Sequence, residues 1–272
     1  MKLGVTTLGC PEWTLEQILT RLPQYGYQGV ELRGLGSDLE LTETPDFTTL
    51  TGRRETRRRF ADAGLEICAV DSSARFADTE SEAQAKNLKM AQQAIELADA
   101  LGASSVRVFG GSIPEGENRA EVVARVADSL RQLGEFAVRE TGNVTVVLET
   151  HDSFSTGAQA AEVLALAAHP RVAALWDLHH PFRQGETPGE TISALRPYVR
   201  MTHLKDSNPG GTYCLLGEGD VPIMEMLRLL SAAGYDGYLN LEWEKRWLPQ
   251  LAEPEIAFPQ YSRVLRDYLT HL

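Results

Sequence analysis

The sequence predicts a single α/β domain over residues 1–272 that folds as one (β/α)8 barrel, or TIM barrel. Short runs rich in β-branched residues alternate with segments of helical periodicity along the whole chain. Segments that follow the predicted strands are long and those that precede them are short turns, as expected where a site lies at the carboxyl ends of barrel strands. An open doubly wound sheet fits less well, because TTLGCPEW stands where a glycine-rich phosphate loop would follow the first strand.

Eight segments have the composition of buried or half-buried strands. They are Leu3–Thr7, Gly29–Arg33, Leu65–Asp71, Ser105–Phe109, Val144–Glu149, Val172–Asp177, Val199–Leu204 and Tyr238–Trp243. No linker, low-complexity segment or change in composition separates them. This unbroken succession is the reason for expecting one domain rather than two.

The segments between these strands carry apolar residues at helical spacing. Thr14 and Gln17 have the spacing of a capping box at the start of the first helix, and Ser81 and Gln84 have it at the start of a later one. The apolar faces run through residues 15–22, 88–101, 123–137 and 261–268. Residues 190–197, after the sixth strand, show the helical pattern less clearly.

The balance of charges argues against some classes of partner. The chain has 26 basic and 38 acidic residues, a formal net charge of −12, which disfavours binding to a phosphate backbone. Five arginines between residues 53 and 59 form a local basic run, which we expect to be the solvated face of a helix. The sequence therefore predicts no nucleic-acid partner.

Three further features bear on location. The cysteines Cys10, Cys68 and Cys214 are widely spaced, which favours a reducing compartment over a disulfide framework. The segment MKLGVTTLGC is too short and polar for a secretory signal, and the most apolar stretch, Ala158–Ala168, is interrupted by Glu162. We therefore expect a cytoplasmic protein with no membrane partner.

Polar side chains stand at the ends of four successive predicted strands. Strand five ends in Glu149, strand six in Asp177, and strands seven and eight carry His203 and Glu242. Because strand side chains alternate between faces, Glu149 shares a face with Val147, and Asp177 shares one with Leu175. If these apolar residues fill the barrel, all four polar side chains project inward at one rim.

Three carboxylates and one imidazole in this arrangement indicate a divalent metal site. Mn²⁺ is the expected ion, with Mg²⁺, Co²⁺ and Zn²⁺ as alternatives. Taken singly, a strand-end acid more often caps a helix or pairs with a cation, and a lone histidine is more often a satisfied core residue. The joint pattern favours the metal, since four of the six histidines (His151, His179, His180 and His203) lie in these same strand-end motifs.

These residues resemble the sugar phosphate isomerase/epimerase superfamily, the xylose isomerase-like barrels, which includes ketose 3-epimerases, hydroxypyruvate isomerase, inosose dehydratase and, more distantly, endonuclease IV. The resemblance spans the whole chain. It lies in Glu149, Asp177-x-x-His180, His203-x-Lys205-Asp206 and Glu242, and in the segments TLGCPEWTLEQIL, GVELR, VRVFGG and LGEGDVP. These motifs are typical of the superfamily and do not identify the substrate.

The resemblance implies one divalent ion held by Glu149, Asp177, His203 and Glu242. It also implies that Glu149 and Glu242 are the catalytic acid and base, and that His180 contacts substrate oxygen. A small polyhydroxy ketone or aldehyde, or its phosphate, would then be isomerised or epimerised by proton transfer through a metal-stabilised enediolate.

Two further side chains are candidates for substrate binding. His151 is expected either to contact substrate or to orient Glu149. Lys205 is expected either to neutralise an anionic substrate or oxyanion, or to pair with Asp206.

The chain also departs from parts of the superfamily pattern. Pro209 and Ser155 stand where ketose 3-epimerases carry an arginine and a second glutamate, so ketohexose 3-epimerase activity in particular is in doubt. A three-zinc endonuclease IV needs further histidine and aspartate ligands after strands three and four and in the strand-seven loop, and VDSS, VFGGS and residues 213–220 contain no histidine, which disfavours the nuclease.

Two alternatives stay open at this stage. A metal-dependent dehydratase of inosose or dehydroshikimate type would share the same first step, and a non-catalytic sugar-binding barrel is a weaker alternative. A homodimer or homotetramer is also expected from the resemblance, and the long acidic segment Gly34–Phe47 is a candidate lid or subunit contact.

Overall fold

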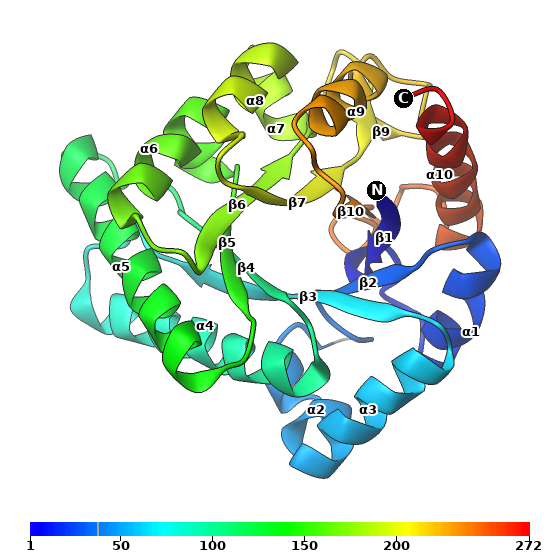
Figure 1. The fold of residues 1–272 in the computed structure, drawn as a ribbon, viewed down its shortest axis with the longest axis horizontal. Coiled ribbons are helices and arrows are strands. Elements are labelled where there is room, and N and C mark those ends of the chain that lie inside the picture. The colour runs from blue at the N-terminus through cyan, green and yellow to red at the C-terminus, as the bar shows by residue number, and fades with distance from the viewer. Residues whose placement is uncertain (37) are drawn as a thin grey trace. The chain divides into compact units, whose positions relative to one another are not determined.

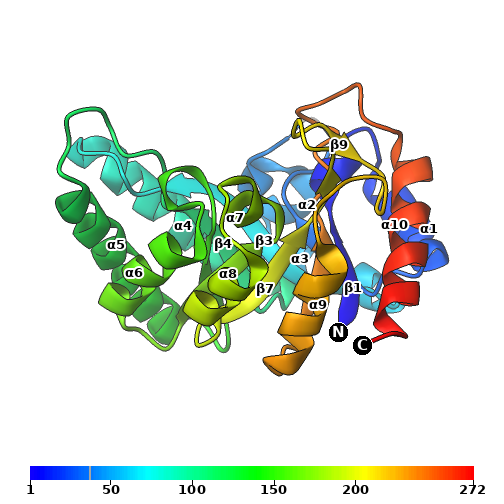
Figure 2. The same cartoon turned by 90° about the horizontal axis from the view of Figure 1, so that it is seen from above.

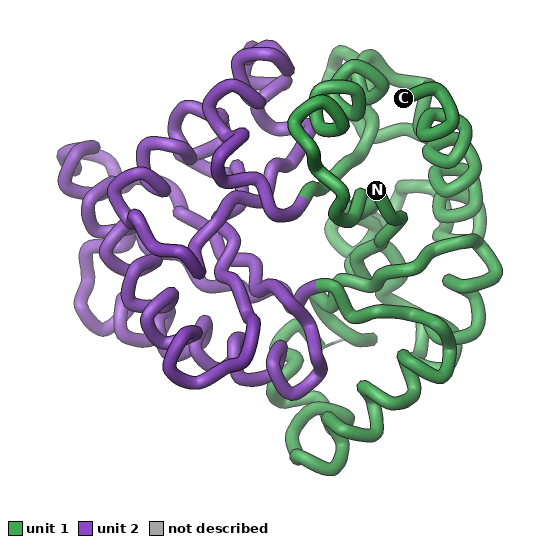
Figure 3. The backbone as a smooth tube through the Cα atoms, viewed as in Figure 1, with its two compact units in different colours: residues 1–68, 202–272 green, residues 69–201 purple. Residues whose placement is uncertain are grey.

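The computed structural model describes residues 1–36 and 38–272, and within them eight strands follow the order of a closed barrel. The order is β1-β10-β7-β6-β5-β4-β3-β2, with helices between successive strands (Figure 1). The predicted (β/α)8 fold is therefore confirmed. The chain divides into two compact units, which are described separately (Figure 3). Unit 1 is Met1–Cys68 with Thr202–Leu272, and unit 2 is Ala69–Met201. The expectation of one domain stays a prediction.

The strands of the barrel lie close to the segments predicted from composition. They are β1 (Lys2–Thr6), β2 (Gly29–Leu32), β3 (Glu66–Arg75), β4 (Ser105–Phe109), β5 (Thr145–Glu149), β6 (Val172–Asp177), β7 (Val199–Leu204) and β10 (Tyr238–Leu241). The longest of them, β3, extends past the predicted end at Asp71 because its pairing with β4 shifts register between Asp71 and Arg75.

The helices follow the predicted apolar faces. They are α1 (Leu15–Tyr25), α2 (Pro45–Thr48), α3 (Leu50–Asp62), α4 (Ser81–Leu101), α5 (Arg119–Glu140), α6 (Gly157–Ala167), α7 (His179–Arg183), α8 (Pro188–Leu195), α9 (Ile223–Ala232) and α10 (Pro254–Leu269). None of the helices in the described part of the chain combines the length and apolar character needed to span a membrane.

In unit 1, β1 pairs in parallel with both β2 and β10, and β10 pairs with Thr202–Leu204 of β7. The Thr14/Gln17 capping box starts α1 as predicted, and Gly26 ends that helix in the left-handed conformation that favours glycine. Helix α1 contacts α10, and the two lie side by side in Figure 2. Three strand side chains here are polar and buried: Thr6 and Glu31, which pair in register, and Asn240, which pairs with Gly4.

In unit 2, strands β3, β4, β5 and β6 pair in parallel in that order. Ala69, Val147, Leu175 and Met201 form one buried apolar cluster. Because Val147 and Leu175 precede Glu149 and Asp177 by two residues, the alternation of side chains predicted for these strands is confirmed. Helices α4, α5, α6 and α8 pack one against the next (Figure 2).

Two helix starts differ from the prediction. Ser81 does not cap α4, because Glu80 holds the N-cap position and the Gln84 amide donates instead to the carbonyls of Asp78 and Thr79. Helix α8 starts at Pro188, before the predicted residues, and is opened by a capping box of Thr187 and Glu190.

The long segments after the strands carry small elements of their own. Residues 205–220 contain an antiparallel pair, β8 (Asp206–Ser207) and β9 (Tyr213–Cys214). Residues 34–47 contain a short 3-10 helix, Leu41–Glu43, and a buried Phe47; residue 37 of this segment lies outside the described residues. The arginine run lies on α3, where Arg54, Arg57 and Arg58 are exposed as expected.

Candidate functional site

In unit 1, the His203 ring lies between two carboxylates. Its Nε2 is 2.9 Å from Oε1 of Glu31, and its Nδ1 is 3.3 Å from Oε1 of Glu242. Glu31 lies in β2, His203 lies in β7, and Glu242 follows β10 directly. All three side chains are buried, His203 and Glu31 completely. An imidazole between two buried acids is a costly arrangement in an apolar core, which points to a role beyond packing.

Lys205 connects this group to a further acid. Its ammonium bonds to Glu242 and lies 3.2 Å from Oε1 of Glu244, although the side chain is fully buried. The hydroxyl of Tyr213, in β9, donates to the same Glu244 oxygen at 2.9 Å. Lys205 therefore pairs with Glu242 and Glu244 rather than with the expected Asp206.

Asp206 stabilises the loop that follows β7. Its carboxylate accepts backbone N–H groups from Ser207, Gly217 and Gly219. The Tyr261 hydroxyl accepts from the backbone of Asp206 and donates to the carbonyl of Cys214. Burial raises the pKa of the Tyr261 phenol, so this hydroxyl stays a donor over the whole physiological range. The loop that carries Tyr213 is thus anchored to a buried carboxylate.

In unit 2, a buried arginine holds two acids. Arg107, in β4, places Nη2 3.1 Å from Asp71 of β3 and Nε 3.3 Å from Oε2 of Glu149 of β5. The guanidinium also lies over the Phe109 ring, 4.0 Å from its centroid. All three charged side chains are at most a few per cent exposed. Glu149 is therefore held at the end of its strand by a charged partner.

Asp177 ends β6 and caps the short helix α7. Its Oδ1 accepts the backbone N–H groups of His179 and His180 at 2.7 and 3.1 Å, and its own N–H donates to the Thr150 hydroxyl. Ligand atoms of Asp177, His179 and His180 lie within 4.8 Å of one another. The Asp177 carboxylate therefore accepts from the first turn of α7, the helix-cap role considered for a strand-end acid. Its other oxygen, Oδ2, lies 3.7 Å from Nε2 of His180.

The partly exposed His151 and His180 rings meet edge to face, with centroids 4.8 Å apart. Nδ1 of His151 lies 3.2 Å from Asp152, and hydrogen bonding from this imidazole lowers the pKa of the Asp152 carboxyl. Asp152 has a φ of 51°, in the left-handed region that is uncommon for residues other than glycine. This backbone conformation places the carboxylate beside the His151 ring.

The comparison with known families now decides what this barrel is. The xylose isomerase-like TIM barrel family matches residues 19–268. The chain belongs to this family. The resemblance stated from the sequence is thereby confirmed at the level of the family.

Curated relatives include both epimerases and dehydratases. Fructoselysine 3-epimerase of Shigella flexneri is 22% identical over 253 residues, covering 89% of this chain and 90% of the relative. A 3-dehydroshikimate dehydratase of Bacillus anthracis is 24% identical over 238 residues, covering 80% and 81% of the two chains.

A solved structure of similar fold is the IOLI protein with a binding zinc atom. It is 17% identical, with a TM-score of 0.83, and the match covers 100% of this chain and 99% of that one. At this identity the likeness supports the fold.

Sequence reasoning about this xylose isomerase-like barrel missed several charged partners: Glu31, Asp71 and Arg107, which are buried, and Glu244, which is partly exposed. Two of them lie in segments that carried the resemblance, Glu31 in GVELR and Arg107 in VRVFGG. An acid or arginine inside a run of strand residues is the signal that could have singled them out, because such side chains are almost never buried unless paired.

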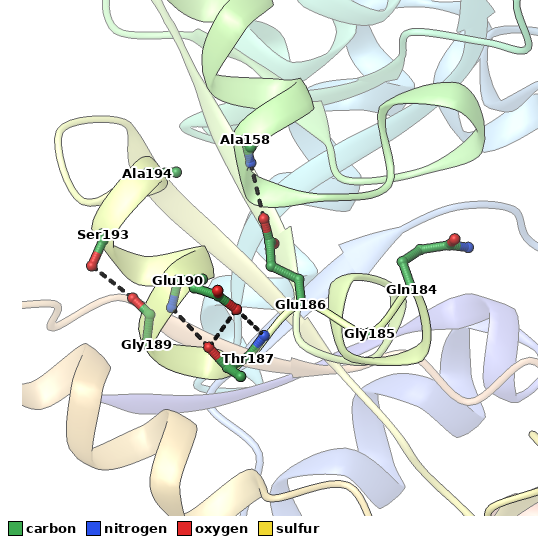
Figure 4. A pocket seen from close by; sticks show the side chains of 9 residues that line it. All are labelled: Ala158, Gln184, Gly185, Glu186, Thr187, Gly189, Glu190, Ser193 and Ala194. Carbon is green, nitrogen blue, oxygen red and sulfur yellow. Dashed lines mark hydrogen bonds between the residues drawn. The ribbon is translucent and has the colours of Figure 1, made fainter.

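A surface cavity in unit 2, of about 870 Å³, holds none of the predicted site residues. It lies between the start of α6 and the loop before α8, as Figure 4 shows. Its carboxylates are already engaged: Glu186 accepts from the backbone of Gly157 and Ala158, and Glu190 belongs to the capping box of α8. The polar groups of this cavity therefore stabilise two helix starts.

Proposed function

We propose that this chain is a divalent-metal-dependent isomerase or epimerase of a small polyhydroxy ketone or aldehyde, or of its phosphate. Glu149, Asp177, His203 and Glu242 would hold one ion, with Mn²⁺ expected before Mg²⁺, Co²⁺ or Zn²⁺. Support comes from the family, whose barrels place their sites at the carboxyl ends of the strands, where all four residues stand in the sequence.

The separation of two donors in unit 1 fits a shared ion. Ligand atoms that each lie about 2.1 Å from one metal are about 3.0–3.4 Å from each other at octahedral or tetrahedral angles. Nδ1 of His203 and Oε1 of Glu242 are 3.3 Å apart. This distance, between two buried strand-end groups, is the observation that carries the proposal.

The bound ion would polarise substrate oxygens and so acidify a hydrogen on the neighbouring carbon. Glu149 and Glu242 would exchange that proton as general base and general acid. Arg107 fixes the carboxylate of Glu149, and Lys205 fixes that of Glu242, so each acid approaches the substrate from a defined direction.

Three side chains are proposed to bind the substrate. His180 and His151 are the partly exposed members of the strand-end motifs, and their rings are in contact. Both can donate to or accept from hydroxyl groups. Lys205 would oppose negative charge that develops on substrate oxygen, while Glu244 and Tyr213 keep its ammonium in place.

The proposal is tested by incubation with Mn²⁺ and a panel of ketoses and inososes in deuterium oxide. Metal-dependent deuterium uptake into product is expected. Glu149→Gln and Glu242→Gln should each lower kcat by roughly 10²–10⁴-fold, because a general acid or base contributes about that much. Glu162→Gln, which changes an exposed carboxylate paired with Arg119, is the matched control and should keep full activity. Turnover of a substrate without any deuterium uptake would exclude the mechanism.

A dehydratase is the second candidate, favoured by the similarity to 3-dehydroshikimate dehydratase and by His151. This imidazole, oriented by Asp152 at 3.2 Å, is a third acid–base group two residues after Glu149 and could protonate a departing hydroxyl. Loss of 18 mass units from the product, measured by mass spectrometry, separates this reaction from epimerisation.

We also propose that the protein works in the cytoplasm on a small carbohydrate, without a nucleic-acid or membrane partner, as a homodimer or homotetramer. The net charge of −12 and the wide spacing of the three cysteines are consistent with that location and with those partners. Light scattering of the purified protein measures the oligomeric state, and failure to nick an abasic DNA duplex would support the absence of nuclease activity.

A further inference from the structure

Glu31 is an acid that the proposed chemistry does not use, although it touches a proposed ligand. It lies on β2, its side chain is completely buried, and its Oε1 is 2.9 Å from Nε2 of His203. The two residues are 172 positions apart in the sequence, and both belong to unit 1. This contact is the shortest that the His203 ring makes with the acids on either side of it.

The geometry determines which nitrogen of the ring carries the proton in this contact. The Glu31 carboxylate oxygen, 2.9 Å from Nε2 of His203, is placed to accept a hydrogen bond from that nitrogen, which favours the tautomer with the proton on Nε2. In a neutral imidazole the other nitrogen then keeps its lone pair. That nitrogen, Nδ1, faces Glu242 at 3.3 Å, which is the side on which the metal is proposed.

We propose that Glu31 is a positioning residue that selects the Nε2–H tautomer of His203 and fixes the plane of its ring, so that Nδ1 is presented to the metal. Carboxylate–histidine–metal arrangements of this kind raise the basicity of the ligand and its affinity for the ion. The inference rests on the proposed function, because it presumes that His203 is a ligand.

A purely structural role explains Glu31 poorly. Burying a carboxylate is costly unless its oxygens are paired. The second oxygen of Glu31, Oε2, has no hydrogen-bond partner among the described residues. A methionine or leucine would fill the same space without this cost. The contact that Oε1 makes with His203 is therefore the gain that offsets the burial.

Zn²⁺ affinity, measured by competition with a chromophoric chelator, provides the first test. Glu31→Met removes the acceptor and should weaken Zn²⁺ binding by about 10–100-fold, the usual effect of losing a partner of a metal-binding histidine. Glu31→Gln keeps an acceptor oxygen without the charge and should show a smaller loss. It also remains informative if Glu31→Met folds poorly, and circular dichroism and thermal melting monitor the fold of every variant.

Thr6→Val is the matched control. Thr6 pairs in register with Glu31 across β1 and β2, is equally buried, and has no hydrogen-bond partner for its Oγ1 among the described residues. Valine has nearly the same shape as threonine. This variant should bind Zn²⁺ with the affinity of the unmodified protein, because it changes the polarity next to Glu31 and leaves the contact with His203 intact.

Nitrogen-15 spectra of histidine in the Zn²⁺-loaded protein provide a second readout, independent of turnover. His203 should show an Nε2-bound proton that exchanges slowly with solvent, and Nδ1 at a metal-bound shift. The slowly exchanging proton should persist in Thr6→Val and disappear in Glu31→Met. A merely structural role for Glu31 would change the melting temperature and leave this resonance in place.

The outcomes separate this inference from the proposed function. If the unmodified protein binds no Zn²⁺ and no Mn²⁺, both are overturned. If it binds the metal and turns over substrate while Glu31→Met keeps the same affinity and the same His203 resonances, only the role of Glu31 is overturned. An equal loss of affinity in Thr6→Val and Glu31→Met would overturn it as well.

Discussion

The strand interiors of the two units are built in different ways. In unit 2, Ala69, Val147, Leu175 and Met201 form an apolar cluster beneath the strand-end acids. In unit 1, the buried strand side chains include Thr6, Glu31 and Asn240, and each has one polar atom without a hydrogen-bond partner among the described residues. The apolar cluster of unit 2 is an ordinary packed core, whereas packing alone does not explain these three polar side chains of unit 1.

The contrast shows where stability and where function are concentrated. In unit 2, the buried guanidinium of Arg107 lies against two carboxylates, those of Asp71 and Glu149. In unit 1, three acids, Glu31, Glu242 and Glu244, have Lys205 and the imidazole of His203 as their partners. Excess buried acid is stabilised when a cation binds. We therefore expect substitutions in unit 2 to lower stability most, and those in unit 1 to change ligand binding most.

Arg107→Met should have the largest effect on stability. It leaves Asp71 and Glu149 buried without their shared partner, and breaking a buried ion pair in this way costs about 3–5 kcal/mol of unfolding free energy. Urea unfolding followed by circular dichroism measures the loss. The exposed pair Arg119–Glu162, 2.7 Å apart, supplies the control: Arg119→Met should cost at most about 1 kcal/mol. If Arg107→Met and Arg119→Met lowered the unfolding free energy equally, the buried ion pairs of Arg107 would contribute no more to stability than an exposed pair.

A pair of core substitutions compares the two interiors directly. Leu175→Ala opens a cavity in the apolar cluster of unit 2 and should lower the unfolding free energy by about 2–5 kcal/mol. Thr6→Val removes a hydroxyl that lacks a partner among the described residues, so the unfolding free energy should stay within about 0.5 kcal/mol of the original value or rise. A large loss in Thr6→Val would mean that the polar interior of unit 1 is stabilised by contacts such as ordered water.

The fold was predictable because its signals are local. Short, largely apolar runs bounded by turns located every barrel strand, and the Thr14/Gln17 spacing located the start of α1. The same spacing failed at Ser81 and Gln84, where Glu80 holds the cap and Gln84 turns back to the preceding carbonyls. A capping box needs the backbone of its first residue to be extended, and two residue types at the right distance do not ensure this.

The site was predictable only in part. Strand-end acids were found because alternation assigns them a face, and Val147 and Leu175 confirm that face for Glu149 and Asp177. Glu31 and Arg107 were missed because their roles depend on partners from other strands. The partner of Glu31, His203, is 172 residues away in the sequence. Spacing along one strand contains no information about which neighbour that strand will have.

Tyr238→Phe should have the smallest effect, and one that depends on pH. Glu66, in unit 1, accepts a hydrogen bond from the Tyr238 hydroxyl at 2.5 Å and pairs with Lys2 at 3.0 Å. The hydrogen bond from Tyr238, followed by that from Lys2, lowers the pKa of the Glu66 carboxyl below its ordinary 4.5. A carboxyl whose pKa is lower in the folded than in the unfolded protein stabilises the fold. This stabilisation is complete at a pH above the unfolded-state pKa and is lost as the pH falls through the folded-state pKa.

At pH 7, Tyr238→Phe should therefore lower the unfolding free energy by less than about 1 kcal/mol, since Glu66 is largely exposed. The difference from the unmodified protein should shrink when urea unfolding is repeated at successively lower pH, as Glu66 becomes protonated in the folded state of both proteins. Tyr235→Phe removes a hydroxyl that donates to a backbone carbonyl, so its effect should not change with pH. If the difference in unfolding free energy between Tyr238→Phe and the unmodified protein did not change with pH, Tyr238 would stabilise unit 1 through packing of its ring rather than through its hydrogen bond to Glu66. The exposed carboxylate of Glu66 would then contribute less to the unfolding free energy than the buried ion pairs of Arg107 in unit 2, at low pH as well as at pH 7.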